Sequence, residues 1–109
     1  MLARKGRHSE ALTHLQEAVR LQPLSAEAHQ NLGLTLRELG RTREATEHLL
    51  EAVRLDPNDA AAHNNLGIAL GSVGRLDEAR RAFERALALR PGFEDARRNL
   101  DLARGSGAR

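Results

Sequence analysis

Apolar side chains recur every three to four residues along most of this chain, which is the spacing of one face of an α-helix. One such set ends at a Gly-Arg pair at residues 40–41, and a second set begins shortly after it. The two sets are Leu32, Leu36 and Leu39, and then Ala45, Leu49, Ala52 and Leu55. The pattern predicts two amphipathic helices joined by a tight turn.

Glycine, proline and capping residues mark the ends of these helices. Gly40 and Gly74 come just past the first helix of each pair, where a left-handed backbone costs other residues most. Ser25 and Asp59 stand where a helix start needs a side-chain oxygen to accept a backbone N–H. A proline follows the second helix of each pair and stops it, at Pro23, Pro57 and Pro91.

The whole arrangement repeats at an offset of 34 residues. Residues 26–59 and 60–93 are identical at 14 of 34 aligned positions. We therefore predict a single domain over residues 1–109, in which two complete repeats are flanked by shorter pieces. These pieces are a partial repeat at 1–23, a C-terminal capping helix at 93–104 and a tail at 105–109.

The repeat resembles the tetratricopeptide repeat (TPR), whose pattern is W-x2-L-G-x2-Y, A-x3-F, P over 34 residues. The matching residues are His29-x2-Leu32-Gly33-x2-Leu36, Ala45-x3-Leu49 and Pro57, and then His63-x2-Leu66-Gly67-x2-Leu70, Ala79-x3-Phe83 and Pro91. Smaller side chains replace the large aromatics of the family at His29, Leu36, His63 and Leu70. The resemblance implies an all-α fold, a right-handed α-solenoid of TPR helical hairpins.

Composition excludes several classes of function. The chain has no cysteine and only two phenylalanines among its aromatic residues, so disulfides and thiolate sites are excluded and the core must be aliphatic. Its 17 basic and 15 acidic side chains give a net charge of only +2, too little for a strong nucleic-acid footprint. There is no apolar segment of signal-peptide or membrane-spanning length, so we expect a cytoplasmic protein that binds neither nucleic acid nor membrane.

The resemblance also implies where a partner binds, because TPR arrays hold peptides in a concave groove lined by the first helix of each repeat. The predicted peptide-binding residues are an asparagine ladder (Asn31, Asn65 and Asn99), an aliphatic ladder (Leu34, Ile68 and Leu102), and Arg37, Asn64 and Arg98. An asparagine can both donate to and accept from a ligand's peptide group. The alternative is that the asparagines are tolerated surface residues and the aliphatic side chains pack against neighbouring helices.

Some TPR domains grip a C-terminal carboxylate with basic residues beside such asparagines. Here the flanking positions are Glu27, Gln30, Ala61 and Asn64, and only Arg98 is basic. A two-carboxylate clamp is therefore not expected.

We predict no catalytic site, metal or cofactor. His29 and His63 occupy equivalent positions, but a zinc site needs a third or fourth ligand that the repeat does not supply. His8, His14 and His48 are expected at the surface. The adjacent Asp77 and Glu78 fit a helix start better than an acid/base pair.

One glycine has no place in the repeat. Gly67 matches Gly33, where two helices are expected to approach closely, but Gly71 matches Arg37 and costs about 1 kcal/mol relative to alanine inside a helix. The spacing of the glycines fits neither a dinucleotide fingerprint nor a P-loop. We hypothesise that a bulky ligand side chain or backbone lies over Gly71 and Ser72.

The N-terminal end offers an alternative function. The first helix of the first repeat is reduced to "MLARK", so that Ala11, Leu12, Leu15 and Val19 are expected to lack part of their cover. An open apolar face is an interface or a liability. The chain is therefore expected to be a piece of a longer array, or a module that forms homo-oligomers through this face.

Overall fold

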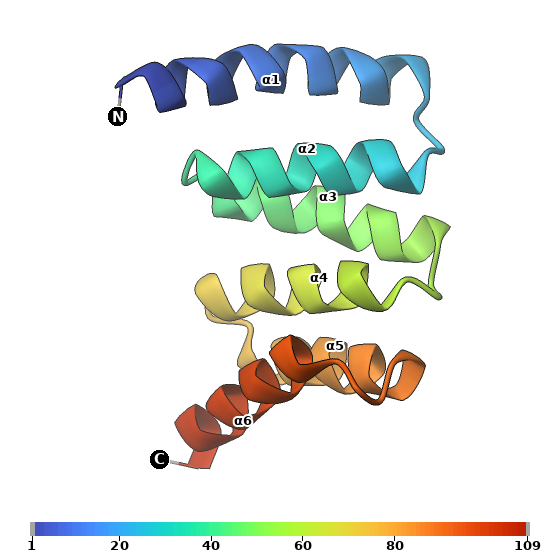
Figure 1. Cartoon of the computed structure of the whole chain (residues 1–109), viewed down its shortest axis with the longest axis vertical. Coiled ribbons are helices and arrows are strands. Elements are labelled where there is room, and N and C mark those ends of the chain that lie inside the picture. The colour runs from blue at the N-terminus through green and yellow to red at the C-terminus, as the bar shows by residue number, and fades with distance from the viewer. Residues whose placement is uncertain (1, 109) are drawn as a thin grey trace. The chain divides into compact units, whose positions relative to one another are not determined.

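The computed structural model describes the backbone of residues 2–108 and the side chains of residues 7–105. This part of the chain consists of six helices without a strand (Figure 1). They are α1 (Leu2–Leu21), α2 (Ala26–Glu38), α3 (Thr42–Leu55), α4 (Ala60–Ser72), α5 (Leu76–Leu89) and α6 (Glu94–Ala108). The predicted all-α fold is confirmed. None of the described helices is long and apolar enough to cross a membrane.

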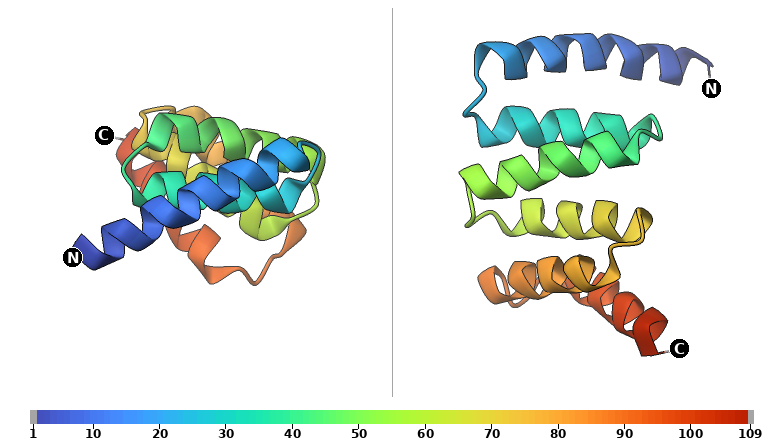
Figure 2. Two further views of the ribbon diagram at one scale, coloured as in Figure 1. Left: turned by 90° about the horizontal axis from the view of Figure 1, so that it is seen from above. Right: turned by 180° about the vertical axis from the view of Figure 1, so that it is seen from behind.

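The chain forms two compact units that divide between Asp56 and Pro57, three residues before the predicted repeat boundary between residues 59 and 60. Unit 1 contains α1, α2 and α3, and unit 2 contains α4, α5 and α6. Within unit 1, α2 and α3 form a hairpin and α1 packs on α2. Within unit 2, α4 and α5 form the equivalent hairpin, and α6 packs chiefly on α5 with a smaller contact to α4 (Figure 2).

The helix ends form as their residues predict. The side chain of Ser25 accepts a hydrogen bond from the backbone N–H of Ala28 at 3.1 Å, and that of Asp59 accepts one from Ala62 at 3.2 Å. Gly40 and Gly74 have positive φ angles of 82° and 86°. Left-handed glycines after α2 and α4 allow the chain to reverse within a few residues.

The core of unit 1 is aliphatic. Leu32, Leu36 and Ala45 are buried together. The apolar side chains of α1 pack against this cluster and are themselves half-buried; they are Leu12, Leu15 and Val19. The apolar face of α1 that the self-assembly alternative invokes is thus partly covered within unit 1.

The core of unit 2 depends on a close approach between α4 and α5. A Cβ atom at Gly67 would lie only 2.5 Å from the ring of Phe83. In unit 1, a Cβ at Gly33 would lie 2.7 Å from the side chain of Leu49. Both distances are far below van der Waals contact, so the predicted packing role of these glycines is confirmed.

Two helix ends differ from expectation. α1 runs without interruption from Leu2, although Gly6-Arg7 corresponds to the turn pairs of the later repeats. α6 continues to Ala108, past the predicted end at residue 104 and through most of the predicted tail. Glycine lowers helix propensity but breaks a helix only when the chain must turn, and positive φ angles in the described chain occur only at Gly40 and Gly74.

Candidate functional site

The predicted binding residues of unit 1 lie on α2. Asn31 is exposed, and Leu34 and Arg37 are half-buried. One guanidinium nitrogen of Arg37 is buried without a hydrogen-bond partner among the described residues. α2 therefore presents an amide and an aliphatic side chain at accessible positions, as the prediction requires, but nothing in unit 1 tests whether they bind a ligand.

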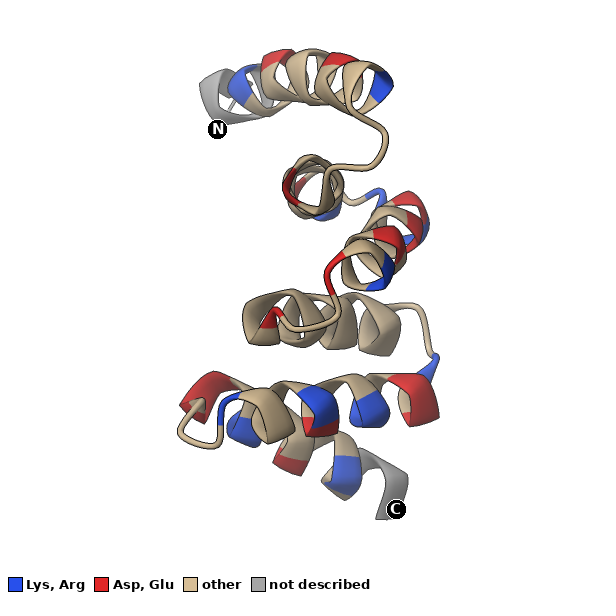
Figure 3. Ribbon diagram, turned by 90° about the vertical axis from the view of Figure 1, so that its right-hand side faces the viewer, with Lys and Arg blue, Asp and Glu red and all other residues tan. Residues whose placement is uncertain are grey.

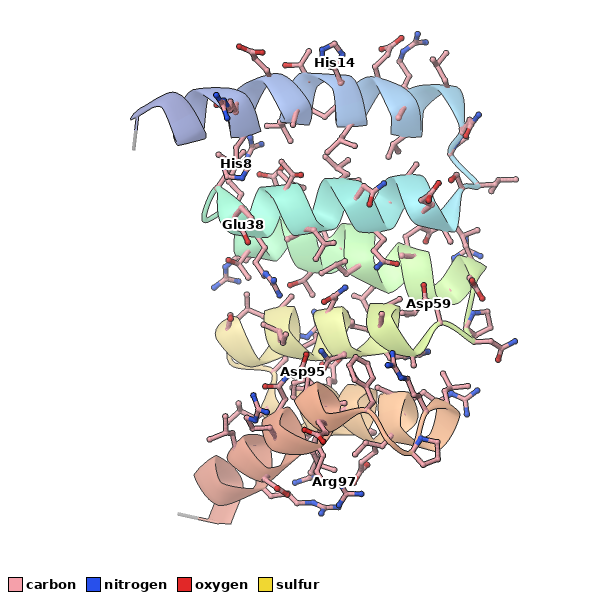
Figure 4. All side chains as sticks on the ribbon, in the orientation of Figure 1. His8, His14, Glu38, Asp59, Asp95 and Arg97 are labelled. Atoms are coloured by element: carbon pink, nitrogen blue, oxygen red, sulfur yellow. The ribbon has the colours of Figure 1, made fainter. Side chains whose placement is uncertain are left out.

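The predicted binding residues of unit 2 lie on α4 and α6. Asn65 and Ile68 on α4 and Asn99 on α6 are half-buried, while Leu102 on α6 is 65% exposed. Figure 4 shows Asp95 on the edge of α6 nearer to α4 and Arg97 on the opposite edge. Asn99 lies one helical turn after Asp95 and shares its edge. Two asparagines and two aliphatic residues of the predicted ladders therefore lie in the same compact unit.

Asn64 and Asn99 form a hydrogen bond that the repeat pattern did not predict. The side-chain N–H of Asn99 donates to the side-chain oxygen of Asn64 at 3.1 Å, and Asn64 is only 6% exposed. Asn64 is therefore positioned to hold Asn99 rather than to meet a ligand itself. Among the described residues the amides of Asn31 and Asn65 have no such partner.

Arg98 is the basic binding residue predicted on α6, as Arg37 is on α2. It is exposed and lies 3.9 Å from the carboxylate of Asp95. This neighbouring acid competes with any ligand carboxylate for the cation.

A pocket of about 270 Å³ opens between the three helices of unit 2. Its lining is Gly67, Ile68, Gly71 and Ser72 from α4, Leu76, Ala79 and Phe83 from α5, and Asn99, Leu102 and Ala103 from α6. We call this the unit 2 pocket. It contains Gly71 and Ser72, over which the sequence predicted a ligand, and one member each of the asparagine and aliphatic ladders on α6.

Sequence reasoning missed the wall that α5 contributes. Leu76 is 45% exposed at the mouth of the unit 2 pocket, and Ala79 and Phe83 lie deeper. The signal that was available is the exchange of Thr42 in the first repeat for Leu76 in the second. An exposed apolar side chain at the first position of an otherwise polar helix start is typical of a binding surface.

Within the described part of the chain no group of three or more histidine, cysteine or acidic residues could hold a metal ion. His63 instead contacts the carbonyl oxygen of Pro57 at 2.9 Å, and His29 contacts that of Pro23 at 2.8 Å. Because a carbonyl can only accept, the Nε2 atom of each ring carries the proton and donates.

His48 was expected at the surface and is in fact half-buried against His29. The two rings stack with centroids 5.4 Å apart, and their Nδ1 atoms lie 3.1 Å apart. Since His29 donates through Nε2, its Nδ1 accepts from Nδ1–H of His48.

We expect His48 to make the stability of unit 1 depend on pH. The pKa of His48 is lowered from its ordinary 6.5, first by burial and then by the charge of His29, against the opposing effect of Glu44, Glu47 and Glu51. The unfolded chain therefore binds this proton more readily than the folded chain. We expect the contribution of His48 to be complete above pH 6.5 and to be lost as the pH falls below it.

Urea denaturation at pH 8 and pH 5, followed by circular dichroism, measures this dependence. His48→Ala should lose less stability than the wild type between these pH values, and Ala82 shows that alanine suits the equivalent position of unit 2. His14→Ala is the control, since His14 is exposed and points away from α2 (Figure 4). An unchanged pH dependence in His48→Ala would contradict the assignment.

Much of the basic charge is neutralised locally. Arg41 and Glu44 form a two-point ion pair at the start of α3, and Arg75 and Glu78 form the same pair at the start of α5. Hydrogen bonds from these arginines lower the pKa of both carboxyl groups. Figure 3 shows both signs of charge on α5, whereas α4 has no charged residue after its N-cap, Asp59. The wall that α4 contributes to the unit 2 pocket is uncharged.

Comparison with known proteins identifies the family. A family model for the tetratricopeptide repeat matches residues 2–60, 31–93 and 64–103. The chain belongs to the TPR family. No curated protein matches its sequence. The TPR resemblance noted in the sequence is thus confirmed over nearly the whole chain.

Solved TPR structures are similar to this chain. The first TPR of Spaghetti (RPAP3), bound to the HSP90 peptide SRMEEVD, has a TM-score of 0.91 at 23% identity and covers 97% of this chain and 84% of that one. The second TPR domain of human RPAP3, in complex with the HSP70 peptide SGPTIEEVD, gives 0.85 at 24% identity, with coverages of 93% and 84%. MamA gives 0.87 at 31% identity, and this chain covers 62% of it. These likenesses show that the chain has the TPR fold.

Proposed function

We propose that this chain is a non-catalytic interaction module whose unit 2 binds an uncharged segment of a partner protein on the face formed by α4 and α6. One observation carries the proposal: Asn99 and Leu102 border an open pocket between α4, α5 and α6. Asn65 and Ile68 occupy the equivalent ladder positions on α4. Hydrogen-bonding amides beside an apolar hollow suit a peptide backbone and its side chains.

The state of the asparagines supports this proposal. Asn65 has no hydrogen-bond partner among the described residues, so its amide can pair with a ligand. Asn99 is held by Asn64 through one of its N–H groups, and its amide oxygen makes no described hydrogen bond. An asparagine whose orientation is fixed loses less entropy when a ligand binds.

The charges favour an internal segment over a C-terminal carboxylate. RPAP3 TPR domains were solved with peptides that end in EEVD. In unit 2 of this chain the basic residue predicted to bind, Arg98, is paired with Asp95, and α4 has no lysine or arginine. The ligand of this chain is therefore proposed to lack an acidic terminus.

Selection from a random phage-displayed peptide library on the full chain tests the proposal. A labelled selected peptide should bind Asn65→Ala about five-fold more weakly than the wild type, as expected for a lost hydrogen bond of about 1 kcal/mol. The control is Gln16→Ala, which removes an exposed amide from α1. Asn31→Ala, measured in parallel, reports whether unit 1 takes part.

The same peptide with an amidated C-terminus should bind as well as the free acid. Failure to select any peptide, or equal binding to Asn65→Ala and wild type, would overturn the proposal. Asn99→Ala is less suitable as the primary test, because it leaves the buried oxygen of Asn64 unpaired and destabilises the fold.

A further inference from the structure

Two glycines one turn apart on α4 differ in what fills the space of their missing side chains. The ring of Phe83 occupies the space beside Gly67, where a Cβ would lie 2.5 Å from it. Beside Gly71, a Cβ would meet only the Cβ of Ala79, at 3.9 Å. Gly67 is therefore required by the core, whereas Gly71 weakens the helix and leaves an open space. That space is part of the unit 2 pocket.

The rim of this pocket exposes large apolar side chains. Leu76 and Leu102 are 45% and 65% exposed, and both line the unit 2 pocket. The lining contains no charged side chain, and its polar members are Ser72 and Asn99. The hydroxyl of Ser72 donates to the carbonyl of Ile68 at 3.0 Å and so is already satisfied within α4. An uncharged group thus suits the pocket better than an ion.

The size of the pocket admits an aromatic side chain. A closed apolar cavity of about 150 Å³ is large enough to bind benzene. The unit 2 pocket, at about 270 Å³, exceeds this volume. Its lining also includes the ring of Phe83, against which a second ring can pack edge to face.

We propose that the unit 2 pocket is a specificity site for one aromatic side chain of the bound segment, and that Gly71 is the residue that opens it. This inference rests on the proposed function for its biological meaning, because the aromatic ring belongs to the proposed peptide ligand. The first repeat has Arg37 and Glu38 at the positions of Gly71 and Ser72. The specificity therefore belongs to the second repeat alone.

Proton–nitrogen correlation NMR of the full chain, titrated with N-acetyl-phenylalaninamide, tests this site directly. We expect saturable shifts at millimolar probe, centred on the amides of Gly71, Ser72 and Asn99. N-acetyl-alaninamide should bind at least ten-fold more weakly. Shifts centred elsewhere, or equal binding of the two probes, would overturn the proposal.

A matched pair of variants exchanges residues between the repeats. Gly71→Arg/Ser72→Glu introduces the residues of the first repeat and should weaken binding of the phenylalanine probe at least ten-fold. Glu38→Ser makes the reverse exchange at an exposed position of unit 1 and should leave the affinity of the unit 2 pocket unchanged. Gly71→Leu provides a second way to fill the pocket, with an uncharged residue that favours the helix. Undiminished binding in both pocket-filling variants would also overturn the proposal.

The probe experiment and the peptide selection test separate proposals, and either proposal can fail without the other. If selected peptides bind but show no aromatic preference and the probe misses the pocket, the specificity site is wrong and the proposed function stands. If the probe binds the pocket as described but no peptide can be selected, the site stands and the proposed peptide-binding function is wrong.

Discussion

Gly67→Ala is expected to destabilise unit 2 by about 1–3 kcal/mol, the usual cost of forcing an extra methyl group into a packed core. The new Cβ would lie 2.5, 2.7 and 2.8 Å from three ring atoms of Phe83. A ring cannot yield as the end of a flexible side chain can, so α4 and α5 must move apart. Far-UV circular dichroism during urea denaturation measures the loss, since the chain lacks tryptophan and tyrosine for fluorescence.

The control is the same substitution one turn later on the same helix. Gly71→Ala places its Cβ in open space, 3.9 Å from that of Ala79, and alanine favours a helix by up to about 1 kcal/mol over glycine. The two variants should therefore change stability in opposite directions. A similar destabilisation by both would mean that the space beside Gly71 is not free.

Features encoded within a few residues could be predicted from the sequence. The turns at Gly40 and Gly74 and the caps at Ser25 and Asp59 depend on neighbouring residues alone, and each formed as expected. The packing of Gly67 was also predictable, because Gly33 repeats it 34 residues earlier. Periodicity in this case carries tertiary information, because equivalent residues make equivalent contacts.

Contacts that break the repeat could not be predicted in the same way. Asn64 and Asn99 are 35 residues apart, one more than the repeat, so neither helix alone indicates their hydrogen bond. His48 has Ala82 as its counterpart, and its stacking on His29 has no second instance to reveal it. In both cases the packing of two helices determines which polar side chain each residue contacts.

The candidate site was likewise predicted only in part from the sequence. The sequence predicted that a ligand lies over Gly71 and Ser72, and both residues line the unit 2 pocket. It did not predict the α5 wall, because Leu76 and Phe83 are separated from α4 by the turn at Gly74. The binding role of the asparagine and aliphatic ladders stays a prediction until a ligand is measured.

Phe83→Ala is expected to have the largest effect on stability, a loss of about 3–5 kcal/mol. Phe83 is only 5% exposed, and its ring fills the space beside Gly67. Truncation would remove that contact and leave a cavity between α4 and α5. Such a loss approaches the whole stability of many small domains, so urea denaturation should be run at low temperature to keep the variant folded in water.

The other phenylalanine provides the matched control. Phe93 lies in the turn before α6, half-buried, with the guanidinium of Arg90 at 4.8 Å from its ring centre. Phe93→Ala should cost about 1 kcal/mol, because a partly exposed cation–π contact contributes little more. Equal losses of stability in Phe83→Ala and Phe93→Ala would contradict the conclusion that the core of unit 2 depends on the contact between α4 and α5.

The double variant Gly67→Ala/Phe83→Ala separates steric conflict from loss of packing. Once the ring is absent, the new Cβ at residue 67 has no clash to relieve and instead fills part of the cavity. The double variant should therefore be no less stable than Phe83→Ala alone, and the two single losses should not add. Additive losses would show that Gly67 serves the backbone of α4 rather than the packing of the Phe83 ring against it.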